Sequence, residues 1–456
     1  MSLANATMAP AITPEERKVL AATLVGTAIE WYDYFIYAQA AGLVLAPLFF
    51  KPIAADNPML AQLLSFATIG ISFLFRPLGA VVCGHLGDRL GRKAVLVMTL
   101  VLMGVSTAAI GLLPTYAQAG AWAPVLLILL RIAQGFSAGG EWGGAALMAV
   151  EHAPKSRRSL FGAFPQIGVP IGMILATLML LVLDAVLGRE RFAEWGWRLP
   201  FLFSVVLIVV GWLIRRSVEE SPVFARMHRL RKESSAPLGR LFRDHSGDVV
   251  RTALIFVGVN AAGYLLIAFF ISYGQKALHL PASQVLAACT LAAVGWLVFT
   301  LVGGWLGDRI GRVRTFQAGY VLLALWAVPM WLLMDTRDIV LFFVGAFGLT
   351  LPLGLTYGPQ AALYAEMFPA RVRFSGVSVG YALGSILGGA FAAMIAQWIL
   401  GAFGQSWLIG VYLIVMSAIS FVAVSSVKDP RGVDLEATDP EVPSGSFGGA
   451  QPAPAP

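Results

Sequence analysis

Long apolar runs alternate with short polar segments along most of the chain. Crossing a bilayer core takes about 20 apolar residues, and twelve runs approach or exceed that length. Because lipid offers no hydrogen-bond partner to an open strand, each run predicts a membrane-spanning helix. The predicted spans cover residues 19–48, 60–83, 94–113, 122–149, 159–183, 197–214, 251–275, 283–305, 315–334, 339–364, 374–399 and 406–427. The pattern therefore predicts an all-α integral membrane protein with twelve transmembrane helices.

The basic residues fall on alternate sides of these spans. With the amino terminus in the cytoplasm, 24 of the 32 Lys and Arg residues lie in cytoplasmic segments, an excess typical of that side. A missing or extra span would destroy this alternation. We therefore expect a multi-pass protein of the bacterial inner (cytoplasmic) membrane with both termini in the cytoplasm. The net charge of +7 is then a topology signal, and we expect no nucleic-acid partner.

Composition excludes several classes of protein. The chain is 58% hydrophobic and 12% charged, with a mean hydropathy of +0.77, whereas a soluble domain is about 25% charged. Cys83 and Cys289 lie in apolar runs and give neither a disulfide framework nor a zinc spacing. The chain has no Gly-x4-Gly-Lys-Ser/Thr loop and no His-Glu-x-x-His segment, which argues against an ATP-driven pump and a zinc protease. We expect no enzymatic activity.

A segment between the second and third spans recurs between the eighth and ninth. Gly84-His-Leu-Gly-Asp88-Arg89-Leu-Gly91-Arg92 matches Gly304-Trp-Leu-Gly-Asp308-Arg309-Ile-Gly311-Arg312 at an offset of 220 residues. A weaker match at an offset of 215 pairs Glu151, Pro154 and Arg158 with Glu366, Pro369 and Arg373. Two six-helix halves in parallel follow from this repeat. The expected organisation is a cytoplasmic segment 1–18, a half 19–214, a cytoplasmic linker 215–250, a half 251–427 and a disordered cytoplasmic tail 428–456.

These motifs resemble those of a known family. The repeated segment resembles the signature loop of the major facilitator superfamily, and Arg131-x-x-Gln134-Gly135 resembles its second signature. Within that superfamily, four motifs resemble the metabolite:proton symporter family: Glu30-Trp-Tyr-Asp33, Phe75-Arg76-Pro-Leu-Gly79, Gly139-Gly-Glu141-Trp-Gly-Gly144 and Trp195-Gly-Trp-Arg-Leu-Pro-Phe201. The resemblance spans about residues 19–427. It implies the major facilitator fold and transport of a small metabolite, since members carry shikimate, 2-oxoglutarate, citrate, or proline and betaine.

Both signature loops are predicted to form a conformational latch. Their glycines permit tight turns, and their aspartates are favoured beside a helix amino terminus or an arginine. The resemblance implies that the latch holds the cytoplasmic side closed in the outward-open state; a simple turn between spans is the alternative. The predicted latch residues are Gly84, Asp88, Arg89, Gly91, Arg92, Asp308, Arg309 and Arg312.

Ionisable residues inside the spans are candidates for proton coupling, because charge is costly in hydrocarbon. Glu30, Asp33, Tyr34 and Tyr37 share one face of the first span at the spacing i, i+3, i+4, i+7, and Glu141 lies on the fourth. We expect Asp33, with Glu30 and Glu141, to accept the coupled proton, since access to water or to a cation changes the proton affinity of a carboxyl group. A static ion pair within the first half is the alternative.

Two arginines favour an anionic substrate. Arg76 and Arg131 lie within the second and fourth predicted spans, and a planar guanidinium suits a carboxylate better than a sugar or an amine. Pairing of each arginine with Glu30, Asp33 or Glu141 is the alternative. The other predicted substrate-binding residues are Tyr34, Tyr37, Gln134, Gln166, Asn260, Tyr264, Tyr357, Gln360 and Tyr381. Interhelical hydrogen bonding is the alternative for each of them.

The sequence thus predicts a proton-coupled symporter that imports a small organic acid by alternating access. Its expected partners are the metabolite, protons and the lipid bilayer; we expect a functional monomer and no cofactor besides the proton gradient. One alternative is proton-driven export, although the exporters carry an adjacent Gly-Pro pair where this chain has Gly168-Val-Pro170. The other is uptake of zwitterions, although the tail 428–456 has no heptads like those of osmosensing members.

Overall fold

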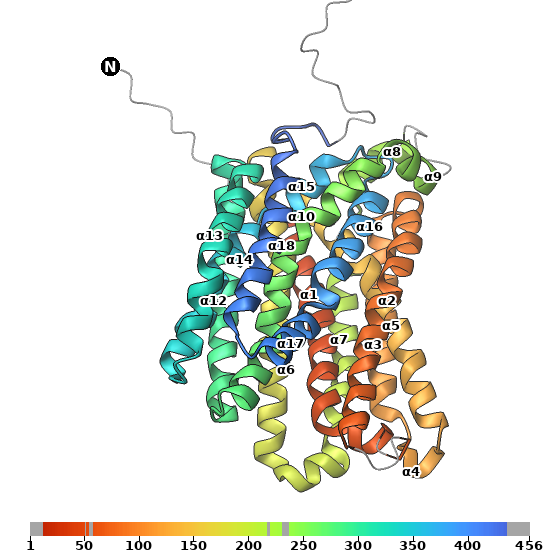
Figure 1. The fold of residues 1–456 in the computed structure, drawn as a ribbon. Coiled ribbons are helices and arrows are strands. Elements are labelled where there is room, and N and C mark those ends of the chain that lie inside the picture. The colour runs from red at the N-terminus through yellow and green to blue at the C-terminus, as the bar shows by residue number, and fades with distance from the viewer. Residues whose placement is uncertain (1–11, 51, 54–57, 217–218, 230–236, 436–456) are drawn as a thin grey trace, which may run out of the picture.

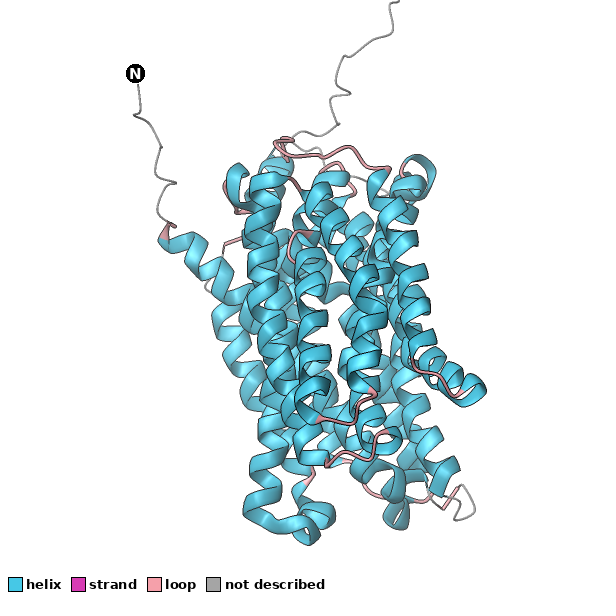
Figure 2. Cartoon of the chain, turned by 60° about the vertical axis from the view of Figure 1, so that its left-hand side comes forward, coloured by secondary structure: helices cyan, strands magenta, loops and turns pink. Residues whose placement is uncertain are grey.

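The computed structural model describes residues 12–50, 52–53, 58–216, 219–229 and 237–435, and every regular element among them is a helix (Figures 1 and 2). We call α1 to α7 the first half and α10 to α18 the second half. The first half contains α1 (Pro14–Ala40) with its continuation Ala41–Phe50, α2 (Pro58–Leu90), α3 (Arg92–Leu112), the short α4 (Tyr116–Ala119), α5 (Trp122–Glu151), α6 (Arg158–Arg191) and α7 (Arg198–Arg216).

Two short helices and a second bundle follow. The linker helices are α8 (Pro222–Arg229) and α9 (Pro237–Asp244). The second half contains α10 (Ser246–Tyr264), α11 (Phe270–Ser272), α12 (Ala282–Ile310), α13 (Arg312–Met334), α14 (Ile339–Tyr357), α15 (Gln360–Met367), α16 (Arg373–Ser385), α17 (Ala392–Phe403) and α18 (Trp407–Ser425). Short π-helical stretches join α10 to α11 and α16 to α17, so each pair forms one span.

The number of spans agrees with the hydropathy pattern. Among the described residues, eleven helices are long and apolar enough to cross a membrane, and α1 with Val44–Phe50 makes a twelfth if this pair, bent by 67°, is one span. Pro47 lies in the π-helical stretch beyond α1. The all-α fold with up to twelve spans confirms the prediction for the fold class.

Single glycines make the two signature turns. Gly91 alone separates α2 from α3, at φ 101°, and Gly311 alone separates α12 from α13, at φ 112°. Only glycine adopts such angles at little cost. The turn is shorter than the loop predicted from the sequence, because Asp88 and Arg89 still belong to the last turn of α2. We call the end of the bundle that carries these turns the signature end.

At the signature end, each half binds the start of a helix of the other half. Asp88 accepts hydrogen bonds from the backbone N–H groups of Phe374 (3.1 Å) and Ser375 (2.9 Å), which begin α16. Asp308 accepts from the N–H groups of Ser159 and Leu160, both at 2.9 Å, which begin α6. The first N–H groups of a helix lack partners within it and carry partial positive charge, so a carboxylate there is stabilised.

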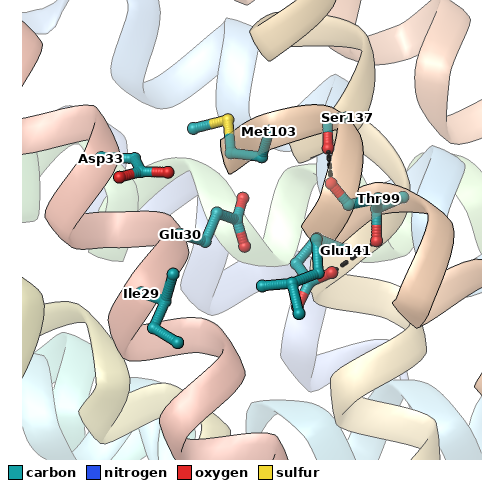
Figure 3. Close-up of a pocket in the computed structure, with 8 residues that line it drawn as sticks. Ile29, Glu30, Asp33, Thr99, Met103, Ser137 and Glu141 are labelled. Carbon is teal, nitrogen blue, oxygen red and sulfur yellow. Dashed lines mark hydrogen bonds between the residues drawn. The ribbon is translucent and has the colours of Figure 1, made fainter. Parts of the chain in front are cut away.

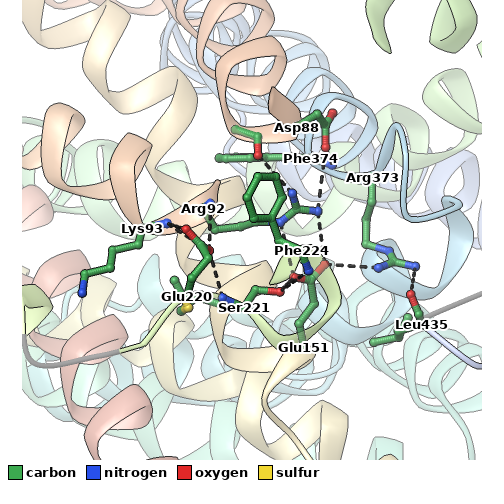
Figure 4. A network of polar contacts seen from close by, with 12 residues as sticks. Asp88, Arg92, Lys93, Glu151, Glu220, Ser221, Phe224, Arg373, Phe374 and Leu435 are labelled. Atoms are coloured by element: carbon green, nitrogen blue, oxygen red, sulfur yellow. Dashed lines mark hydrogen bonds and ion pairs between the residues drawn. The ribbon is translucent and has the colours of Figure 1, made fainter. Parts of the chain in front are cut away.

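Glu151, the last residue of α5, forms a second bridge between the halves (Figure 4). Its carboxylate lies 3.3 Å from Nε of Arg92 in its own half and 3.1 Å from Nη1 of Arg373 in the other half. The hydroxyl of Ser221, from the linker, donates to it as well. This buried anion is therefore fully partnered by groups from three parts of the chain.

Glu366 makes the equivalent bridge in the second half. It lies 3.1 Å from Nε of Arg312, in its own half, and 3.1 Å from Nη1 of Arg158, in the first half. The weaker sequence repeat at an offset of 215 residues thus corresponds to a pair of arginines exchanged between the halves.

The structure divides the predicted latch residues into two groups. Asp88, Arg92, Asp308 and Arg312 take part in the contacts across the halves, and Gly84 allows close approach to Ser375, since a Cβ at Gly84 would lie 2.8 Å from its Cα. Arg89 and Arg309 are exposed and belong to no bridge between the halves: Arg89 is 3.4 Å from His85, and Arg309 lies over the ring of Trp305. That the network opens and closes stays a prediction.

The chain beyond α18 crosses the signature end. Arg158 donates to the carbonyl of Val433 (2.7 Å) and Arg373 to that of Leu435 (3.0 Å), and Leu435 is buried. The described part of the predicted disordered tail, residues 428–435, is therefore packed against both exchanged arginines. The predictions for 1–11 and 436–456 lie outside the described residues.

Within the first half, α5 lies directly against α2. A Cβ placed on Gly139 would meet the carbonyl oxygen of Arg76 at 2.0 Å, so only glycine fits there. Small residues allow such approach between helices in lipid. This contact sets the position of Arg76 relative to α5.

Exchanging Asp88 for Asn should loosen the signature end. An amide can accept only on its oxygen, and its NH2 group faces the N–H donors of α16, which costs about 1 kcal/mol or more. We expect a thiol introduced by Ala361→Cys, which is buried between the halves beside Gly162, to react roughly fivefold faster with N-ethylmaleimide. The background would carry Ala at Cys83 and Cys289, and Arg89→Gln serves as the control. Equal labelling rates in Asp88→Asn and the parent protein would contradict the role of Asp88.

Exchanging Gly139 for Ala should destabilise the first half by about 1–3 kcal/mol, because the methyl group has no room. Thermal unfolding of the detergent-purified protein measures this as a lowered Tm. Gly70→Ala is the matched control, since nothing lies within 4 Å of a Cβ there. An unchanged Tm in Gly139→Ala would show that α5 and α2 are less closely packed than described.

Candidate functional site

A small cavity lies between the two halves. The first half contributes Trp31 of α1 and Val169 of α6. The second half contributes the rest of the lining, which is Phe256, Val259, Asn260, Gly263, Tyr264, Ile267, Trp296, Tyr357 and Tyr381. Four predicted substrate-binding residues, Asn260, Tyr264, Tyr357 and Tyr381, therefore line one cavity. Its walls are mostly aromatic, which suits a small substrate with a flat or apolar body.

Stacked rings join the halves beside this cavity. Tyr381 of α16 lies parallel to Trp142 of α5, with ring centroids 3.9 Å apart, and stacks on Phe256 of α10 at 4.5 Å. Trp296 contacts Tyr357 at 5.7 Å. The sequence analysis did not select Trp31, Phe256 or Trp296. Apolar residues are too frequent in the spans for a cavity-facing ring to be recognised without knowledge of the packing.

Gln166 and Gln360 connect helices next to the cavity. Gln166 of α6 accepts from the indole N–H of Trp142 (2.5 Å) and donates to the carbonyl of Tyr357 (3.1 Å) and to the side-chain oxygen of Gln360 (3.2 Å). Neither glutamine lines the cavity. Gln166 therefore makes the interhelical bonds named as the alternative, and these bonds cross between the halves.

Arg76 of α2 is a buried cation beside the cavity. Its guanidinium lies over the rings of Phe73 (4.1 Å), Tyr34 (5.4 Å) and the cavity-lining Trp31 (6.0 Å). It lies within electrostatic range of Tyr264 and Tyr381. In the described part of the chain no carboxylate comes within 4 Å of it, and its Nε has no hydrogen-bond partner. Aromatic faces partly compensate a buried cation, but a carboxylate would do so better.

Arg131 of α5 belongs to a separate cluster. It donates to Gln134 (2.6 Å) and the carbonyl of Thr68 (3.4 Å) and lies over the ring of Tyr37 at 3.8 Å. The Tyr37 hydroxyl is in turn 2.5 Å from that of Thr68. None of these partners lines the cavity. The structure thus places one of the two predicted arginines, Arg76, beside the cavity and keeps Arg131, Gln134 and Tyr37 outside its lining.

Tyr34 is the link between the two arginines. Its ring lies 5.4 Å from the guanidinium of Arg76 and 6.0 Å from that of Arg131. It also packs edge-on against Trp31 at 5.4 Å. Because the Tyr34 ring lies near both guanidinium groups, a displacement of Arg76 would alter the surroundings of Arg131.

A second, narrow pocket brings the three predicted proton-coupling residues together (Figure 3). Glu30 and Asp33 project into it from α1, with Glu141 opposite on α5. The rest of the lining is Ile29, Thr99, Leu100, Met103 and Ser137. Every lining residue belongs to the first half, so this acidic pocket is separate from the cavity between the halves.

The three carboxylates have different partners. Asp33 accepts from Ser204 of α7 (2.5 Å) on one oxygen, while the other oxygen has no partner. Glu141 accepts from Thr99 (2.6 Å) and forms an ion pair with Arg215, near the end of α7. No ion pair joins Asp33 or Glu30 to Arg76 or Arg131 within the described residues. The static pairing alternative thus holds for Glu141, but with a cation that the sequence analysis placed in the linker.

Arg215 and Ser204 are the polar partners that sequence analysis missed. Hydropathy ends the sixth span at Ile214, which assigns the next residue to the linker, although its side chain is buried. A serine in an apolar helix gives no signal of its own. A glutamate within a span requires a cationic partner, and this requirement of Glu141 was the one signal in the sequence that pointed to a nearby basic residue.

Comparison with known proteins agrees with this architecture. The Major Facilitator Superfamily model matches residues 24–386. The Inner membrane metabolite transport protein YhjE of Escherichia coli (strain K12) is 41% identical over 424 residues, which cover 92% of this chain and 95% of that protein. The Shikimate transporter of the same strain is 35% identical, covering 91% of this chain and 95% of the relative. A Putative proline/betaine transporter of Staphylococcus aureus (strain COL) is 34% identical, covering 93% and 91%.

Solved structures show the same fold. The proton:xylose symporter XylE bound to 6-bromo-6-deoxy-D-glucose superposes with a TM-score of 0.78, covering 94% of this chain and 99% of that one, at 16% identity. Proteins of this superfamily are transporters and not enzymes. The family match and the full-length relatives show that the chain is a multi-pass membrane transporter of metabolites and belongs to the major facilitator superfamily.

Proposed function

We propose that this protein imports a small organic anion together with protons by alternating access. The observation that carries the proposal is Arg76, a buried guanidinium beside the inter-half cavity with no carboxylate within 4 Å in the described residues. An unpaired charge at the bilayer midplane is costly. A substrate carboxylate in the cavity would remove that cost with a bidentate contact.

Proton coupling is supported by the acidic pocket. Glu30 stands within electrostatic range of Arg76 on one side and of Glu141 and Arg215 on the other. An anion that binds to Arg76 reduces the positive charge acting on Glu30, so a proton on Glu30 becomes less unfavourable. Proton and anion would then favour each other's binding, which is the requirement for symport.

The proposed orientation places the signature end in the cytoplasm. The basic residues concentrate there, and the bridges at Asp88, Asp308, Glu151 and Glu366 close that side. Import would require these bridges to part after substrate and proton are bound. We further propose a bacterial inner membrane, cytoplasmic termini, a functional monomer and no cofactor besides the proton gradient.

Uptake of a zwitterion is a second candidate, which the aromatic walls favour. Rings of Trp and Tyr bind quaternary ammonium groups through their faces, and the cavity contains Trp31, Trp296, Tyr264, Tyr357 and Tyr381. Relatives named as proline/betaine transporters at 34% identity support this candidate. Arg76 would bind the carboxylate in either case.

The test of function is the external pH of a weakly buffered suspension of de-energised cells that express the protein. Shikimate, benzoate, 2-oxoglutarate, glycine betaine and xylose would be added singly. An alkaline jump with one compound, abolished by Asp33→Asn, is the expected result, because that exchange removes a carboxylate of the acidic pocket. An unchanged rise of the external pH in Asp33→Asn would show that the transported proton binds at another residue. Silence across the panel, together with no uptake of the labelled compounds, would contradict import of this class and favour export.

Exchanging Arg76 for Gln should weaken carboxylate transport specifically. Removing one partner of a buried, hydrogen-bonded charge pair costs about 2–5 kcal/mol, so the half-saturation concentration should rise at least about 30-fold. Concentration-dependent uptake of the active compound measures this, with Arg243→Gln, which is largely exposed, as the control. Unaltered saturation in Arg76→Gln would show that the anion binds elsewhere.

A further inference from the structure

Arg215 reaches from the signature end into the first half. It is the penultimate residue of α7, yet its side chain is only 4% exposed. Gly26 of α1 makes room for it, because a Cβ there would lie 2.0 Å from Nη2 of Arg215. Since Gly26 precedes Glu30 by about one helical turn, the guanidinium lies between the acidic pocket and the signature end.

Arg215 satisfies Glu141 completely. Its Nη2 donates to one carboxylate oxygen and its Nη1 to the other (3.2 Å), and Nη1 also donates to the carbonyl of Leu96. Thr99 adds a further hydrogen bond at 2.6 Å. A bidentate, hydrogen-bonded pair of this kind strongly favours the charged form of the carboxylate. Glu141 is therefore paired with a cation on both carboxylate oxygens in the described conformation.

The other acids of the pocket lack such a partner. Within the described residues, Asp33 has the hydroxyl of Ser204 and Glu30 has no ion pair. The other titratable or charged groups within electrostatic range of these acids are Arg76 and the tyrosines Tyr264, Tyr357 and Tyr381 near Glu30, Tyr32 near Asp33, and the Cys83 thiol near Glu141. Two of three neighbouring carboxylates are thus left without a counter-ion, and like charges in a low dielectric do not all ionise.

We propose that Arg215 is a positioning residue for proton coupling, which neutralises Glu141 so that Glu30 and Asp33 carry the transported proton. This proposal rests on the proton coupling proposed above. Without Arg215, all three carboxylates of the pocket lack a counter-ion, so the proton is no longer assigned to Glu30 and Asp33.

Purified protein in liposomes separates coupling from binding. Labelled shikimate, benzoate, 2-oxoglutarate and glycine betaine are each measured twice, as accumulation under an inward proton gradient and as exchange at equal pH. In Arg215→Gln, accumulation should fall roughly tenfold or more relative to exchange, and its pH profile should shift. Arg215→Lys, which keeps the charge, should retain part of the accumulation. Arg216→Gln, on the exposed neighbour, is the matched control.

The double variant Glu141→Gln/Arg215→Gln tests the mechanism. It removes both charges of the pair, so accumulation should recover to within about twofold of the parent protein. A double variant that exchanges label yet still fails to accumulate it would overturn the role of Arg215, as would an unaltered pH profile in Arg215→Gln. If the parent protein transports without any response to the proton gradient, the proposed coupling fails first, and this outcome is recognised before any variant is made.

Discussion

The cost of an unpaired charge in hydrocarbon is the constraint on which this structure depends. Lipid supplies neither water nor a counter-ion. Every ionisable side chain within the spans must therefore have a partner in the protein or be able to bind one, such as a ligand or a proton. Four acids at the signature end, Asp88, Glu151, Asp308 and Glu366, have hydrogen-bond or ion-pair partners from both halves. Among the described residues, the buried charged side chains without an ion pair, Glu30, Asp33, Arg76 and Arg131, all belong to the first half. That distribution separates the parts that hold the molecule closed from the part that is available to a ligand.

The two halves are alike at the signature end and unlike in the middle. Asp88 and Asp308 both bind the start of a helix from the opposite half, and the exchanged arginines repeat the same geometry. A repeat of this kind gives one interface two equivalent sets of bonds. In the centre, by contrast, the first half supplies the carboxylates and Arg76, while the second half supplies neutral aromatic walls. Charged groups and most of the aromatic cavity walls thus belong to different halves.

Features that depend on patterns over many residues could be predicted from the sequence. Features that depend on a single contact could not. Spans and halves follow from hydropathy and from the 220-residue repeat, which average over many residues. Arg215 was assigned to the linker because its burial depends on the space left by Gly26. Arg131 and Arg76 were indistinguishable as cations within spans, and only packing shows that Arg76 alone adjoins the cavity. Arg89 and Arg309 belong to the signature motif but point away from the interface between the halves, which a motif cannot reveal.

Under the proposed function, the position of Glu30 explains how anion binding and proton binding can be coupled electrostatically. Glu30 lies within electrostatic range of Arg76, which is beside the cavity, and of the Glu141–Arg215 pair. Binding of an anion to Arg76 changes the field at Glu30 without any movement of one half against the other, because all four groups belong to the first half. By linkage, a proton on Glu30 must strengthen anion binding by the same factor. Coupling is then a property of one half, whereas release requires the bridges between the halves to open. A transporter built this way can bind both ligands in one step and move them in another.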